Sequence, residues 1–126
     1  MEDRLIEVGI YKDEFNVISN VNLPLLNIYR SIGLRRHMIS RQHFSCLRYI
    51  DDIPNIIENP DYVGKSKNDD NAIELVKKYD KNVLIGIKLS EDNGYLYVST
   101  MYELQESKLN RRIYSGRIKE FDIDNL

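Results

Sequence analysis

Hydrophobic and polar positions alternate most clearly in the second half of the chain. Three segments there, 72–79, 82–90 and 95–100, have the two-residue period of strands whose successive side chains point to opposite faces of a sheet. The separator between the last two contains Asn93-Gly94, a strong short-range signal for a hairpin turn. The pattern predicts an antiparallel meander.

A different spacing precedes this meander. Phe44, Leu47 and Ile50 recur every three residues after Ser40, a candidate N-cap, and predict a helix over about 41–50. This placement puts His43 on the helix and His37 just before it. A further short helix is expected over 51–59, because Pro54 suits its first turn and Pro60 ends it.

Another helix and a strand are expected after the meander. Residues 101–112 have helical periodicity and end in two arginines, where cations suit the helix dipole. Residues 113–121 indicate a last strand that turns at Ser115-Gly116. In the first quarter, 4–10 and 15–18 resemble short strands, and periodicity does not decide the type of 25–29. The order predicts an α+β fold in which N-terminal helices pack on a small antiparallel sheet, with a late helix.

Composition is that of a soluble globular protein. The chain of 126 residues is expected to form a single domain over 1–126, with 42% hydrophobic and 30% charged residues. No apolar run approaches the roughly 18–20 residues that span a bilayer. The acidic first segment lacks the layout of a secretory signal. We therefore expect a cytoplasmic protein that has no membrane partner.

Charge is distributed unevenly although the formal net charge is only -2. Residues 30–50 contain five arginines and no acid, and residues 107–119 contain five further cations and no acid. Ten of the 18 lysines and arginines thus lie in two short windows. The windows are either two solvated faces or two basic walls around an anion such as RNA.

The candidate proton-transfer residues are the two histidines, His37 and His43, both in the first basic window. Histidine is the side chain most often used for proton transfer near neutral pH. The alternative for each is an exposed or hydrogen-bonded histidine without a catalytic role. Lys88 is a lone cation in an apolar strand, and is either solvated or directed into a cleft beside Tyr97, Ser99 or Thr100.

The acidic residues do not indicate a metal site. Cleavage of RNA by its own 2′-hydroxyl needs a base, an acid and cations for the phosphorane charge, and requires no metal. Metal-dependent nucleases use clustered carboxylates, whereas the acids here form surface-like runs such as Asp51-Asp52 and Asp69-Asp70. The single cysteine, with two histidines, leaves too few ligands for zinc. No metal or other cofactor is expected.

The order of several motifs resembles a known family. The segments GLRRHMISRQH, IIENPDYVG, NVLIGIKL and YLYVSTMYELQESKLNRRIYSGR are similar to phage-associated members of the barnase/EndoU/colicin/RelE-like nuclease superfamily, abbreviated PBECR. The resemblance runs from about Tyr29 to Phe121. It implies N-terminal helices against a sheet of about four antiparallel strands and a metal-independent ribonuclease. Related domains act as toxins in phage and bacterial conflict systems.

The resemblance also implies roles for individual residues. His37 or His43 would be the general base or acid, Lys88 the cation of the sheet, and Ser99 or Thr100 the late hydroxyl. A basic tail would hold phosphate through Arg111, Arg112, Ser115 and Arg117. Arg41 of the first window and Tyr97, whose ring can stack on a base, complete the expected substrate-binding set.

Two functions are therefore expected. The first is metal-independent cleavage of RNA, with tRNA among the candidates, by 2′-hydroxyl transesterification in a phage- or mobile-element-associated toxin with an immunity or antitoxin partner. The alternative is a non-enzymatic module, or a nuclease fold without activity, that binds RNA or an acidic protein through the same two basic windows.

Overall fold

A single sheet organises the chain. The computed structural model describes residues 4–122, and seven strands of this part form one sheet in the order β1-β2-β6-β5-β4-β3-β7. Neighbouring strands are antiparallel except β2 and β6, which are parallel. The strands are β1 (Leu5–Ile10), β2 (Asn27–Ser31), β3 (Tyr62–Lys65), β4 (Ala72–Lys78), β5 (Asn82–Ser90), β6 (Tyr95–Glu103) and β7 (Ile118–Glu120).

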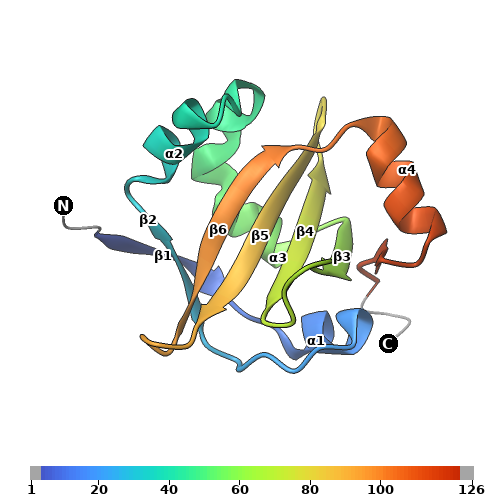
Figure 1. Ribbon diagram of the computed structural model, residues 1–126, viewed down its shortest axis with the longest axis horizontal. Coiled ribbons are helices and arrows are strands. Elements are labelled where there is room, and N and C mark those ends of the chain that lie inside the picture. Colours follow the sequence, from blue (N-terminus) through green and yellow to red (C-terminus); the bar gives the residue numbers. More distant parts are fainter. Residues whose placement is uncertain (1–3, 123–126) are drawn as a thin grey trace.

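Four α-helices and one 3₁₀-helix accompany the sheet in the described part of the chain. They are α1 (Asp13–Ser19), α2 (Leu34–Ser40), the 3₁₀-helix η1 (Phe44–Asp52), α3 (Ile53–Glu58) and α4 (Glu106–Tyr114). Figure 1 shows α3 passing behind β5 and β4, whereas α2 and α4 stand at opposite sides of the sheet.

The two faces of the sheet are buried to different extents. On the inner face, alternate residues such as Leu75 and Ile85 are fully buried against apolar residues of the helices, including Phe15 and Ile53. We call this cluster the main core. Burial of each large aliphatic side chain contributes about 1.5–3 kcal/mol. On the outer face, α4 packs over one part only, through a smaller cluster around Leu109. The rest of the outer face is left to polar and aromatic side chains.

The expected sheet of about four antiparallel strands under N-terminal helices is wrong, although the protein is α+β overall. The first quarter supplies two strands, β1 and β2, and β2 pairs in parallel with β6. Residues 15–18, expected as a strand, lie in α1, where Phe15 reaches the main core. Both errors have one cause: short apolar runs are compatible with helix and strand, and only contacts with distant segments decide between them.

The helix expected over 41–50 is present only in part, because residues 41–43 are not helical and the rest belongs to a 3₁₀-helix. Helix α2 ends at Ser40, whose hydroxyl donates to the carbonyl oxygen of His37 (2.8 Å) instead of capping a following helix. Gln42 then adopts a left-handed conformation (φ 60°), and η1 begins at Phe44. His37 therefore lies on a helix, and His43 lies just before one.

The late helix begins later than expected, whereas other local predictions are confirmed. Strand β6 continues to Glu103 because Met101 pairs with Ile85 and is buried in the main core, so that α4 starts only after Gln105. The strands β1, β4 and β5, the hairpin at 91–94 and the short helix with Pro54 in its first turn are present.

Candidate active site

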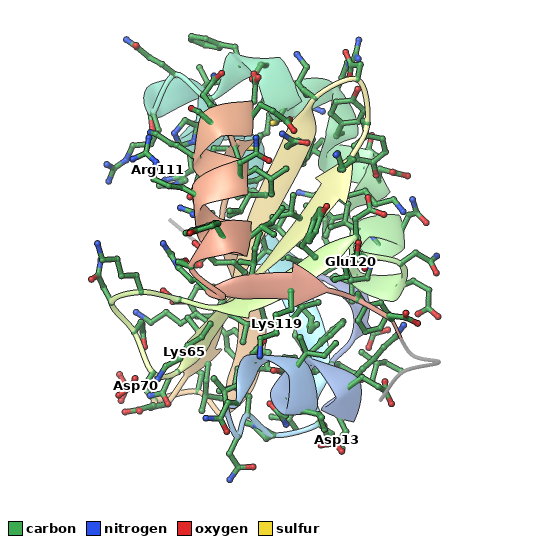
Figure 2. All side chains as sticks on the ribbon, turned by 90° about the vertical axis from the view of Figure 1, so that its right-hand side faces the viewer. Asp13, Lys65, Asp70, Arg111, Lys119 and Glu120 are labelled. Carbon is green, nitrogen blue, oxygen red and sulfur yellow. The ribbon has the colours of Figure 1, made fainter. Side chains whose placement is uncertain are left out.

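A hollow on the outer face gathers five cations. It has a volume of about 710 Å³ and lies between α4 and the loop that joins β3 to β4. Figure 2 shows Arg111 of α4 on the same side of the molecule as Lys65 and Asp70, which bound that loop. We call this hollow the cationic cleft; its cations are Lys67, Lys108, Arg111, Arg112 and Arg117. Such a concentration of positive charge suits a phosphate group.

A buried carboxylate, Glu74 of β4, forms part of the wall of the cationic cleft. It is only 9% exposed, and it points to the outer face because its neighbours Ile73 and Leu75 point to the main core. Its Oε1 accepts hydrogen bonds from Arg112 (3.3 Å) and Arg117 (2.8 Å). The two guanidinium groups compensate the cost of burying this charge.

Glycines lie on both sides of Glu74, and neighbouring groups approach each of them closely. Gly64 of β3 and Gly86 of β5 are its partners in the neighbouring strands, and Gly86 pairs in turn with Thr100 of β6. A register shift after Gly86 brings Ser99 and Thr100 to the same place: a Cβ on Gly86 would lie 3.1 Å from Ser99 Oγ and 3.0 Å from Thr100 Cγ2. Ser99 and Thr100 therefore lie together on the outer face, two strands away from Glu74.

Helix α4 and the turn after it position the arginines. Leu109 anchors α4 on the sheet, and Arg111 and Arg112 lie in its last turn. The Ser115 hydroxyl donates to the carbonyl oxygen of Arg112 (3.1 Å), and Gly116 has φ 80°. This turn returns the chain so that Arg117 reaches Glu74. The structure thus brings together all four residues of the basic tail expected to hold phosphate.

His43 lies beside the cationic cleft. Its ring is 5.6 Å from the ring of Tyr102, which lines the cleft, and its Nδ1 is buried without a hydrogen-bond partner among the described residues. The main chain holds it there, since its N–H donates to the carbonyl oxygen of Met38 (2.8 Å). Of the two histidines, His43 is therefore the one that contacts a residue lining the cationic cleft.

His37 belongs to a second hollow. It is exposed on α2 and lines a space of about 760 Å³ between α2 and β6, together with Tyr97 and Ser99. We call this hollow the α2 groove. The expected site residues are thus divided between two hollows.

Lys88 and Arg41 line neither hollow. Lys88 of β5 pairs with Tyr97 across the β5–β6 ladder, and its Nζ is 3.0 Å from the carboxylate of Asp69. The Asn71 N–H and Lys88 both donate to Asp69 and lower the pKa of its carboxyl, while Asp69 raises the pKa of Lys88. Lys88 thus ties the β3–β4 loop to the sheet. Arg41 is exposed at the end of α2.

The first basic window does not form one wall. Arg35 and Arg36 line the α2 groove, whereas Arg30 is 4.0 Å from Asp51 and Arg48 forms an ion pair with Asp80. These arginines come from three different elements, β2, α2 and η1.

Six residues that line the cationic cleft were missing from the site expected from the sequence: Ser66, Lys67, Asn68, Glu74, Tyr102 and Lys108. Glu74 had a usable signal, because it is an acid at an alternating position between two buried residues of a strand. Lys108 also had a signal, because it is one of the five cations in residues 107–119. Lys67 had none, because it comes from a loop far from α4 in the chain and meets it only in the folded structure.

In residues 4–122, no group of three or more histidine, cysteine or acidic side chains is arranged to hold a metal ion. Cys46 is buried in the main core, which raises the pKa of its thiol. In the same range no helix has the length and apolar character needed to cross a membrane.

Comparison with known proteins identifies a family. No curated protein and no solved structure matches the chain. One family model, described as phage-Barnase-EndoU-ColicinE5/D-RelE like nuclease3, matches residues 6–111 and so covers most of the chain, including the sheet apart from β7 and the greater part of α4. The match confirms the family expected from the motifs. The chain belongs to the phage-Barnase-EndoU-ColicinE5/D-RelE like nuclease3 family.

Proposed function

We propose that the protein is a ribonuclease that cleaves RNA by attack of the 2′-hydroxyl on the adjacent phosphate, without a metal ion. The observation that supports this most directly is Glu74, a buried carboxylate between Arg112 and Arg117 in a cleft of about 710 Å³. A carboxylate can accept the proton of a nucleophile, and guanidinium groups can neutralise a phosphorane. The proposed cleavage needs a proton acceptor and positive charge at the same phosphate.

The reaction assigns a step to each group. Glu74 takes the proton of the 2′-hydroxyl while O2′ forms a bond to phosphorus. Arg112 and Arg117 share the growing charge on the phosphorane oxygens. The P–O5′ bond then breaks, and His43 donates a proton to the leaving O5′. The products are a 2′,3′-cyclic phosphate and a 5′-hydroxyl end.

The other expected site residues take supporting roles in this proposal. Arg111 and Ser115 hold the phosphates that flank the scissile one, since both line the cationic cleft. Thr100 lies across Gly86 from Glu74 and can hydrogen-bond the substrate. Lys88 acts through Asp69 on the β3–β4 loop that forms part of the cleft wall.

A cleavage assay with purified protein tests the mechanism. RNA should be cut to 2′,3′-cyclic phosphate ends in the presence of EDTA, and RNA with a 2′-deoxyribose at the cleavage position should not be cut there. His43→Ala should lower the rate by about 10²–10⁴-fold, the usual contribution of a general acid. Expression of the wild type and of His43→Ala in bacteria would test the toxin role, because only the wild type should arrest growth.

Several results would contradict the proposal. Undiminished cleavage by the double variant His37→Ala/His43→Ala would remove histidine from the mechanism. Loss of cleavage in EDTA would indicate a metal-dependent reaction instead. Tight RNA binding without any product would favour the alternative, a non-enzymatic module that uses the same cations.

A further inference from the structure

The α2 groove arises where the sheet opens between β2 and β6. Their parallel ladder consists of two residue pairs, Ile28 with Leu96 and Tyr29 with Tyr97. After Tyr29 the chain continues through Ser31 into α2, while β6 continues along β5. The two segments enclose a space of about 760 Å³ beside Tyr97, Val98 and Ser99.

The lining of the α2 groove combines apolar surface, an aromatic ring and cations. Ile32 and Ile39 are 48% and 45% exposed, and each contributes apolar surface to the groove. Tyr97 adds an aromatic ring, and Arg35 and Arg36 add positive charge. Nucleobases have flat apolar faces and lie next to phosphates, so this combination suits one nucleotide of RNA.

The α2 groove and the cationic cleft are adjacent on the outer face. Ser99 lines the groove and lies beside Gly86, and Gly86 is paired with Glu74, which lines the cleft. Neighbouring strands of a sheet are about 4.8 Å apart, so two strand spacings, about 10 Å, separate Ser99 from Glu74. One RNA strand lying across β6, β5 and β4 can therefore enter both hollows.

We propose that the α2 groove binds an unstacked base of single-stranded RNA while a neighbouring phosphate occupies the cationic cleft. The proposal rests on the proposed function, since it places the RNA relative to Glu74. The base stacks on Tyr97. Ser99 Oγ donates to the Gly86 carbonyl oxygen at 3.3 Å, so its lone pairs are available to accept a hydrogen bond from the edge of the base. A paired base is not accessible to this groove, and the substrate is single-stranded.

Binding of a non-cleavable probe tests the groove separately from the chemistry. The probe is a short single-stranded oligonucleotide of mixed sequence with 2′-O-methyl sugars and a fluorescent label, and its Kd is measured by anisotropy. Tyr97→Ala should weaken binding about tenfold, the typical loss when an aromatic ring under one base is removed. Tyr97→Phe keeps the ring and should bind like the wild type. Tyr114→Ala is the matched control, because Tyr114 is 96% exposed and lines neither hollow.

A second pair of variants avoids the sheet. Ile39→Asp places a carboxylate in the α2 groove from an exposed helical position and should weaken binding. Val17→Asp makes the same kind of change at a 60% exposed position of α1 and should leave the Kd unchanged. Thermal unfolding of each variant shows whether it is folded. If Tyr97→Ala does not fold, the comparison of Ile39→Asp with Val17→Asp decides whether the α2 groove binds the probe.

The outcomes distinguish RNA binding in the α2 groove from ribonuclease activity. An unchanged Kd in Tyr97→Ala and Ile39→Asp, or an equal loss for the same probe annealed into a duplex, overturns the groove proposal even if the wild type cleaves RNA. A selective loss for the single strand supports the groove. If the variants show that loss but the wild type does not cut unmodified RNA, ribonuclease activity fails and the groove stands as a binding site.

Discussion

At the scale of residues, the environment of Glu74 determines what the outer face can do. Of the described residues that line the cationic cleft, Glu74 is the only acid, and its partners Arg112 and Arg117 are also largely buried. An RNA phosphate in the cleft would draw on the same two guanidinium groups. In the proposed mechanism, the three side chains therefore form a unit that holds the base and its electrostatic partners together before substrate arrives.

Replacement of Glu74 by glutamine tests this unit. Glu74→Gln keeps the size of the side chain but removes the proton acceptor, and we expect cleavage to fall by about 10²–10⁴-fold. RNA affinity should stay equal or rise, because a negative charge leaves the cleft. Cleavage rates and probe binding of the same preparation measure both quantities.

Glu120→Gln is the control for this change, because Glu120 is an exposed residue of β7 and lines neither hollow. It should leave the cleavage rate unchanged. Wild-type cleavage by Glu74→Gln would show that another group removes the proton of the 2′-hydroxyl.

At the scale of elements, the cationic cleft depends on how closely β7 approaches β3. Gly64 of β3 pairs with Ile118 of β7, and a Cβ on Gly64 would clash with the carbonyl oxygen of Arg117 and with Ile118. The strand β7 has only three residues, so little else holds it in this register. Its position matters because Arg117 directly precedes it.

Gly64→Ala should therefore displace β7 and the arginine together. The obstructing Arg117 atom belongs to the backbone and cannot rotate away, and we expect the free energy of unfolding to fall by about 1–3 kcal/mol. Cleavage should fall as well, because Arg117 moves away from Glu74. Urea denaturation and the cleavage assay measure the two effects.

Gly86→Ala provides the comparison on the other side of Glu74. Its Cβ would meet only side-chain atoms of Thr100 and Ser99, at 3.0 and 3.1 Å, which can adjust by small movements. Its loss of stability should be smaller than that of Gly64→Ala. A larger loss of stability in Gly86→Ala than in Gly64→Ala would mean that the contact between β3 and β7 is not tight.

At the scale of the whole molecule, local charge matters more than net charge. The chain has a formal charge of -2, yet five cations gather around one hollow. Figure 2 shows Lys119 on the side of β7 away from α4, at a distance from Arg111. RNA affinity should therefore come from one face of an otherwise acidic protein.

The salt dependence of RNA binding measures this local charge. Each phosphate contact contributes about -0.7 to the slope of log K against log salt for a single strand. Arg111→Ala should make the slope shallower by about 0.7, because Arg111 lines the cationic cleft. Lys119→Ala should leave it unchanged, since Lys119 lines neither hollow. An equal change in both variants would indicate diffuse binding over the surface.

The sequence by itself determined the elements whose signals are local. Alternation identified β4 and β5, and Asn93-Gly94 identified the hairpin, because neighbouring residues alone set these patterns. The motifs also identified the family. Ser115-Gly116 marked the turn through which Arg117 returns to the sheet, and it is present.

Only the tertiary structure decided how segments distant in the chain combine. The parallel pairing of β2 with β6, and the choice of helix for α1, depend on contacts that no short window contains. Glu74 meets Arg112 and Arg117 across about forty positions of the chain, and His43 meets Tyr102 across about sixty. The sequence shows which side chains are cationic and which are able to transfer a proton. Folding decided which of them share a cleft, because that depends on strand order and register, which a local pattern does not encode.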